Sequence, residues 1–206
     1  MTEETHLKLK DIKQNFRLLM NGETTKSMRE KGVDYHLNWG ANILDLRKMA
    51  EEYGHDYPLA IELWKENIRE CKILATMIMP PKEMPAEIVE LWMEQTPSLE
   101  IAEQAAYNLF QHLDYASVLA FQWIASEKEF EQVCGFHVLS RLFMKGMEPD
   151  ERGINEVIDQ ILTAIQGESF SVKHAAISCV RRFAELGDAY EQIARSSMKS
   201  IDLDLY

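Results

Sequence analysis

The sequence has no long apolar run and no flexible linker, and each absence narrows the class of protein. No apolar stretch approaches the length of about 18 residues that a membrane-spanning helix needs. The first ten residues, MTEETHLKLK, carry acids where a secretory signal would have a basic region. No Ser/Gly/Pro-rich stretch divides the 206 residues. We therefore expect one domain over residues 1–206, no membrane partner and a cytoplasmic location.

Cysteines are few, and motifs of metal or nucleotide chemistry are missing. Cys71, Cys134 and Cys179 are an odd number without CxxC spacing, and each lies inside a helical apolar pattern. We predict that they are buried, reduced thiols. The six histidines form no HExxH motif, and the chain has neither a glycine-rich phosphate loop nor a G-x-S-x-G elbow. The sequence therefore predicts no metal site and no cofactor.

Basic residues are scarce in the second part of the chain. The net charge is −12, but residues 1–80 hold 12 Lys and Arg against 13 Asp and Glu, while residues 81–206 hold 10 against 21. Between Lys82 and Lys128 there is no Lys or Arg at all. Phosphate contacts supply most of the non-specific affinity for nucleic acid, so DNA would avoid this acidic surface unless it is turned away.

Apolar residues at helical spacing, separated by short turns, run through most of the chain. Asn42 can cap one helix that Gly54 ends, and Asp56 with Pro58 can begin a second that runs to Pro80. Repeated along the chain, this pattern predicts about ten helices and no strands. Paired helices at intervals of roughly 30 to 45 residues favour an all-α, HEAT-like (armadillo-type) α-α superhelix. Residues 200–206 are expected to be a frayed tail.

One stretch also resembles a known family. The pattern consists of Gly40, Leu46-Arg47, Leu63-Trp64, Arg69-Glu70 and Ile73-Leu74-Ala75. It resembles the bacterial DNA alkylation repair family, the AlkC/AlkD-type DNA glycosylases built from HEAT-like repeats. The resemblance is clearest over residues 28–80 and extends to about residue 185. It implies a HEAT-like fold, duplex DNA as a partner and, in the family, excision of alkylated bases.

The resemblance also indicates where a catalytic site would lie. The family's Trp-Asp motif with a second Asp falls on Leu99-Glu100 and Glu103, so the two acids survive as glutamates and the Trp does not. The family's Arg falls on Val133, its later aromatic on Cys179 and an early Tyr on Lys31. Glu103 and Glu100 are therefore the candidate catalytic residues, although Glu103 also suits a carboxylate near a helix start. The chain is predicted to be a diverged member whose site residues are largely substituted.

Other candidate contacts with DNA are cations and tryptophans. The tryptophans at positions 39 and 92 could stack on bases, although Trp92 lies at core spacing and Trp39 in a loop. The basic candidates lie on predicted helices, one of them near the start of the fold. They are Lys31, Arg141, Lys145, Lys173, Arg181 and Arg182.

Three hypotheses of function follow. The first is a DNA-surveying or lesion-binding protein with weak or absent glycosylase activity. An alternative is a protein-interaction scaffold whose acidic concave surface takes a basic or helical partner. A second alternative is an active alkylbase glycosylase with a shifted site, using Glu103 or Glu100 as its carboxylate.

Overall fold

The structure, a computed structural model, describes residues 2–30 and 35–199, and within these ranges its helices are joined by turns and loops that hold one isolated β-bridge. The all-α prediction is confirmed. The predicted frayed tail at 200–206 lies outside the described residues. The α-helices are α1 (Glu3–Leu18), α2 (Gly22–Glu30), α3 (Ile43–Tyr53), α4 (Tyr57–Lys65), α5 (Arg69–Ile78), α6 (Ala86–Glu94), α7 (Leu99–Asn108), α8 (Ala116–Ile124), α9 (Glu129–Met144), α10 (Glu151–Gln166), α11 (Phe170–Ala184) and α12 (Asp188–Lys199), with 3₁₀ turns η1 (Pro81–Glu83) and η2 (Phe110–His112).

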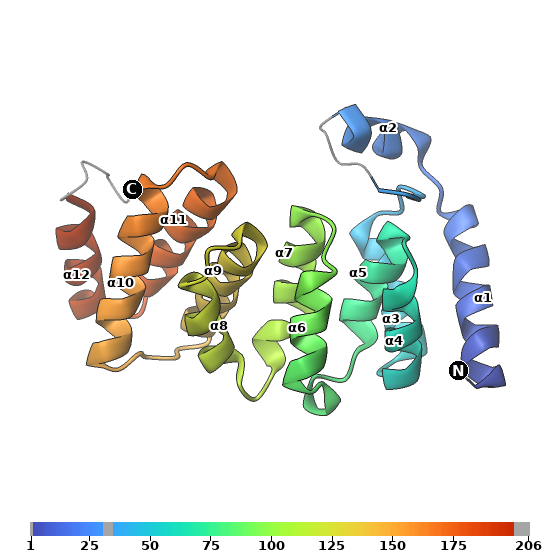
Figure 1. Cartoon of the computed structure of the whole chain (residues 1–206), viewed down its shortest axis with the longest axis horizontal. Coiled ribbons are helices and arrows are strands. Elements are labelled where there is room, and N and C mark those ends of the chain that lie inside the picture. The colour runs from blue at the N-terminus through green and yellow to red at the C-terminus, as the bar shows by residue number, and fades with distance from the viewer. Residues whose placement is uncertain (1, 31–34, 200–206) are drawn as a thin grey trace. The chain divides into compact units, whose positions relative to one another are not determined.

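These helices form two compact units, Met1–Leu109 and Phe110–Tyr206. In the first unit α5 packs against α3, α4 and α7, and α1 packs against α4 (Figure 1). In the second unit α9 packs against α8 and α11, and α11 also contacts α10 and α12. A single domain over residues 1–206 stays a prediction. Across the part of the chain that the structure describes, no helix has both the length and the apolar character needed to cross a bilayer.

The predicted caps begin the helices where the sequence places them. The side chain of Asn42 accepts a hydrogen bond from the backbone N–H of Asp45, and Asp56 does the same for Leu59. Gly54 ends α3 with a φ of 62°, a conformation that glycine adopts without a steric cost. Capping is local chemistry, which explains why it can be recognised in the sequence.

The predicted helix from Asp56 to Pro80 is wrong, because the chain breaks between α4 and α5. Glu66 and Ile68 are extended there. Ile68 forms a parallel β-bridge with Leu37, and the backbone N–H of Arg69 donates to the Leu37 carbonyl oxygen at 3.1 Å. A segment from before α3 thus takes hydrogen bonds that a continuous helix would use. The break places Arg69 and the next residue at the start of a new helix.

Two stacked tryptophans form the core of the first unit. Trp64 on α4 and Trp92 on α6 lie with ring centroids 4.1 Å apart and planes 3° from parallel, and both are 2% exposed. The Trp64 indole N–H donates to Gln95 at 3.1 Å, and the Lys72 ammonium lies 4.4 Å from the Trp64 ring centroid. The rings therefore bury a large apolar area while the polar N–H of Trp64 keeps a partner.

In the second unit, α8 and α9 approach each other closely at Gly135. A Cβ atom at that position would lie 2.8 Å from the backbone nitrogen of Ile124 and 3.0 Å from the carbonyl oxygen of Ala120. Both contacts are with backbone atoms, which cannot move away as a flexible side chain can. The absence of a side chain at Gly135 therefore sets the spacing of this helix pair.

Truncation of Trp92 tests the stacked core. We expect Trp92→Ala to lower the free energy of unfolding by about 3–5 kcal/mol, because it removes a buried ring and leaves a cavity beside Trp64. Leu91→Ala on the same helix is the control, since Leu91 is 43% exposed. Urea denaturation followed by circular dichroism measures both changes. Equal, small effects of the two substitutions would contradict a buried role for Trp92.

Thiol reactivity provides a second test. All three cysteines are free and buried, as predicted. Burial raises the pKa of the Cys179 thiol to about 12 and also raises that of Cys71, which disfavours the reactive thiolate. We expect a thiol reagent at pH 8 to label none of the three in the native protein and all of them in urea. Rapid labelling of native protein would contradict this burial.

Candidate nucleic-acid interface

Arg69 is a buried cation at the start of α5, with a side chain only 2% exposed. Its Nε and Nη2 donate to the two carboxylate oxygens of Glu100 at 2.8 and 2.6 Å. Its Nη1 donates to the Ala41 carbonyl oxygen at 2.9 Å and to Glu70 at 3.1 Å. Burial alone would lower the pKa of the guanidinium, but Glu100 and Glu70 raise it above its ordinary value. Arg69 therefore stays charged inside the protein.

Glu70 holds the loop that precedes α3. Its carboxylate, 0% exposed, accepts hydrogen bonds from the backbone N–H groups of Trp39, Gly40 and Ala41 at 3.2, 2.9 and 3.2 Å. Gly40 has a φ of 73°, and a Cβ there would lie 2.3 Å from the carbonyl oxygen of Asn21. Only glycine fits at this position. The loop is thus held on one side by the buried carboxylate of Glu70, and the backbone of Asn21 lies against its other side.

Glu100, the first of the two candidate catalytic acids, is 26% exposed and already accepts three side-chain hydrogen bonds. Besides the two bonds from Arg69, it accepts one from the Tyr35 hydroxyl at 2.6 Å, and Tyr35 also contacts Ser98 at 2.7 Å. Burial alone would raise the pKa of Glu100, but the hydrogen bonds and charge of Arg69, with the bond from Tyr35, hold it below its usual range. The carboxylate is therefore an anion whose charge Arg69 compensates.

Glu103, the second candidate, lies on the next turn of α7 and is half-buried. It stands close to the start of the helix, where a carboxylate interacts favourably with the helix dipole. Its catalytic role stays a prediction.

The two tryptophans proposed to stack on bases lie in different surroundings. Trp92 is inside the core on Trp64, so stacking on a base would require it to leave that position. Trp39 is half-buried, and the Arg17 guanidinium carbon lies 5.9 Å from its ring centroid. The buried indole N–H of Trp39 has no hydrogen-bond partner among the described residues.

In the second unit, three basic side chains gather where α9 ends. The Lys145 ammonium donates to the Gln111 carbonyl oxygen at 3.2 Å, which brings it beside His112. Partial burial and then the charge of Arg141 lower the pKa of Lys145. Partial burial and then the charge of Lys145 lower the pKa of His112. We name this set, His112, Arg141 and Lys145, the α9 cluster; an anion bound there would relieve the repulsion between Arg141 and Lys145.

The remaining basic candidates lie along α11 or outside the described residues. Lys173 is half-buried and Arg181 is exposed. Arg182 is paired with Glu185, its Nη1 lying 2.9 and 2.7 Å from the two carboxylate oxygens. Lys31 lies outside the described residues. In residues 2–30 and 35–199, no group of three or more His, Cys, Asp or Glu side chains is placed to hold a metal ion.

Comparison with known proteins identifies the family. A family model described as DNA alkylation repair enzyme matches residues 12–185. The chain belongs to this family. No curated protein matches the sequence.

A solved structure supports the fold of this DNA alkylation repair family member. That structure is described as part of a new family of proteins related to the HEAT-like repeat DNA glycosylases with affinity for branched DNA structures. The alignment covers 94% of this chain and 83% of that one, with a TM-score of 0.82 and 19% sequence identity. The likeness confirms the predicted HEAT-like helical fold.

The structure shows what occupies the family's site positions in this DNA alkylation repair protein. Val133, where the resemblance places the family's Arg, is 1% exposed, and Cys179, where the resemblance places its later aromatic, is 0% exposed. Leu99 replaces the Trp and is half-buried. The two fully buried positions are apolar core in this chain and offer nothing to a bound nucleotide.

Sequence reasoning missed three residues of these sites. Arg69 belongs to the family pattern, but nothing in the sequence indicates that its partner is Glu100, which lies 31 residues away. Tyr35 and His112 stand outside any recognisable motif. A charged pair at the start of an otherwise apolar helix, as at Arg69-Glu70, is the one feature that could have pointed to a buried network.

Glu100→Gln tests the buried network. We expect a loss of about 3 kcal/mol in the free energy of unfolding at pH 7, because one partner of a buried ion pair loses its charge. The pKa of Glu100 is lowered in the folded protein, so its contribution is present above the unfolded pKa of about 4.3 and disappears as the pH falls through the lower folded value. The stability of the variant and of the unaltered protein should therefore converge as the pH falls from about 4.3 through the lowered pKa of folded Glu100.

Urea titrations from pH 7 to pH 3 measure this convergence. Glu90→Gln is the control, since Glu90 is exposed on α6 and surface substitutions stay within about 0.5 kcal/mol. A difference between Glu100→Gln and unaltered protein that does not depend on pH would contradict the ion pair.

Proposed function

We propose that this protein binds DNA, including branched DNA, and surveys it without excising alkylated bases. The observation that carries the proposal is the engagement of Glu100 by Arg69 and Tyr35. The family membership supports DNA as the ligand. The geometry of the site argues against excision of a base.

Excision of a cationic alkylated base needs a carboxylate that faces the developing positive charge. The two oxygens of Glu100 accept three hydrogen bonds, and its charge is compensated by Arg69 at 2.6 Å. To act on a substrate, Glu100 would have to leave Arg69 with a buried charge that Glu70 alone compensates. That cost would be added to the activation barrier, whereas catalysis requires interactions that strengthen in the transition state.

The other groups of the family site support the same conclusion. The buried side chains of Val133 and Cys179 cannot contact a nucleotide from inside the core. Trp92, stacked on Trp64, offers no open aromatic face. Standard excision would need these groups placed to within about 1 Å, because such a displacement alone can cost about a hundredfold in rate.

DNA binding is supported by the α9 cluster and by the relative. Repulsion between Arg141 and Lys145 is relieved when a phosphate binds beside them, and the release of counterions from DNA adds to the affinity. The related structure is described as one of a family with affinity for branched DNA structures. The net charge of −12 does not oppose this proposal, because binding depends on the local potential at the contact.

A protein-interaction role remains a second candidate because of one surface of the first unit. Helix α6 carries exposed Glu87, Glu90 and Glu94. No Lys or Arg follows until Lys128 in the sequence. Such a face would attract a basic partner and repel phosphate. Glu100, by contrast, pairs with Arg69, so its charge is compensated.

Binding to intact duplex DNA, abasic-analogue duplex DNA and a three-way junction, each over a salt series, tests the proposal. We expect affinity that falls steeply with salt and no base release from alkylated DNA in the same samples. No binding at low salt would contradict the DNA role and favour the interaction role. Base release would contradict the proposal that the site is inactive.

Arg141→Gln/Lys145→Gln tests the α9 cluster. We expect the slope of log affinity against log salt to become shallower by about 2, because two phosphate contacts are lost. Arg195→Gln/Lys199→Gln, on exposed positions of α12, gives the matched change in charge. An equal effect of both pairs would contradict a specific role for the cluster and indicate a general effect of net charge.

A further inference from the structure

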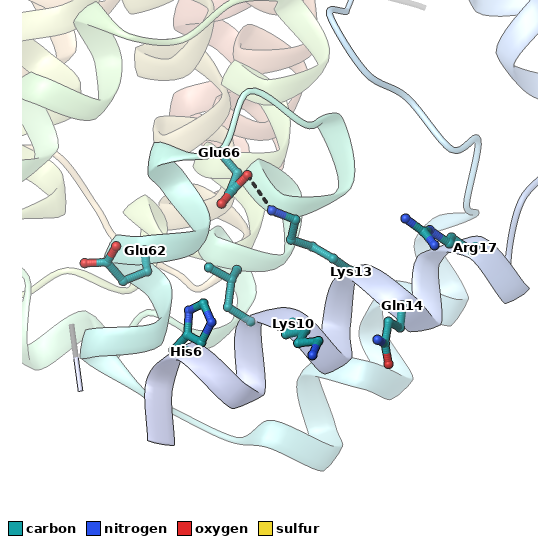
Figure 2. A pocket seen from close by; sticks show the side chains of 8 residues that line it. His6, Lys10, Lys13, Gln14, Arg17, Glu62 and Glu66 are labelled. Carbon is teal, nitrogen blue, oxygen red and sulfur yellow. Dashed lines mark hydrogen bonds and ion pairs between the residues drawn. The ribbon is translucent and has the colours of Figure 1, made fainter. Parts of the chain in front are cut away.

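A groove of about 430 Å³ lies between α1 and α4 in the first unit. Most of its lining comes from one face of α1, and Figure 2 shows this face opposite two carboxylates from α4 and the turn after it. The lining residues are His6, Leu9, Lys10, Lys13, Gln14, Arg17, Glu62 and Glu66.

The two carboxylates of the groove are already paired. Glu66 binds the Lys13 ammonium at 2.9 Å, as Figure 2 shows, and Glu62 binds Lys65 at 2.7 Å. Lys10 and Arg17 are exposed, and neither pairs with a carboxylate in residues 2–30 and 35–199. The groove therefore has an excess of positive charge in a protein whose net charge is −12.

The two unpaired cations are spaced along the groove. Lys10 and Arg17 are two helical turns apart on the same face of α1, which separates their backbones by about 10 Å. The Arg17 guanidinium lies 5.9 Å from the Trp39 ring centroid, an arrangement that holds the side chain in place before a ligand arrives. Gln14 lies between them and offers an amide donor. An extended chain of negative charges fits this spacing better than one small anion.

We propose that this groove binds the phosphodiester backbone of a second DNA segment, such as one arm of a branched DNA. The inference rests on the proposed function, which assigns a first segment to the α9 cluster. The two basic surfaces belong to different compact units, so each has its own set of cations. An arm held in the groove would add its own phosphate contacts to the affinity for branched DNA.

Lys10→Gln/Arg17→Gln in the full chain tests the groove. Anisotropy of a labelled three-way junction and of a duplex with the same arm sequence is measured from about 50 to about 200 mM salt. We expect the junction slope to become shallower by about 2, so that the loss of affinity across this range is about tenfold smaller than for unaltered protein. Duplex affinity should change less than about twofold, because the duplex occupies the α9 cluster.

Two further variants separate the groove from general effects. Lys48→Gln/Lys82→Gln removes the same charge from exposed positions of the first unit outside the groove, and it should leave the junction slope unchanged. Glu66→Gln releases Lys13 and should steepen the junction slope by about 1. A gain of this kind cannot come from misfolding.

The outcomes distinguish the groove from the proposed function. If unaltered protein binds both DNAs and the slope of Lys10→Gln/Arg17→Gln matches that of the control pair, the groove proposal is overturned and DNA binding stands. An equal loss on duplex and junction also overturns it, because the groove would then hold the first segment. If unaltered protein binds neither DNA, both proposals fail.

Discussion

The charge of Arg69, buried at the start of α5, is the constraint on which the first unit depends. A guanidinium 2% exposed must keep its hydrogen bonds, because an unpaired buried charge costs several kcal/mol. Glu100 and Glu70 accept most of the hydrogen bonds that the Arg69 guanidinium donates. Through Glu100 the network reaches α7 and Tyr35, and through Glu70 it fixes the loop at Trp39 to Ala41. One cation thus joins three segments that are distant in the sequence.

The pairing of Arg69 with Glu100 also limits the part that Glu100 could take in base excision. The resemblance places an acid of the DNA alkylation repair family at Glu100, and a carboxylate whose charge Arg69 compensates is less able to stabilise a cationic base. Stability and catalysis would compete for one side chain. The apolar burial of Val133 and Cys179 is consistent with this, since a chain without excision chemistry is free to place core residues at those positions. The fold and the pairing of Glu100 therefore support the proposal of a scaffold that keeps the fold without the reaction.

Under the proposed function, local charge pairing rather than net charge decides where DNA binds. Many cations of the chain are neutralised within the protein, as Lys13 is by Glu66 and Arg182 by Glu185. Two places where cations gather are the α9 cluster in one unit, and Lys10 with Arg17 in the other. Acidic residues collect elsewhere, on α6 among other places. A protein of net charge −12 can thus present two surfaces of positive potential, which suits a ligand with more than one arm.

The sequence by itself determined the helical class, the caps at Asn42 and Asp56 and the burial of the cysteines, because capping and apolar spacing act within a few residues. Only the tertiary structure decided the break after α4, the partner of Arg69 and the place of Trp92. Each of these depends on groups roughly 30 residues apart, such as Leu37 with Ile68, Arg69 with Glu100 and Trp64 with Trp92. Periodicity shows which face of a helix is buried, but it does not name the residue that lies opposite.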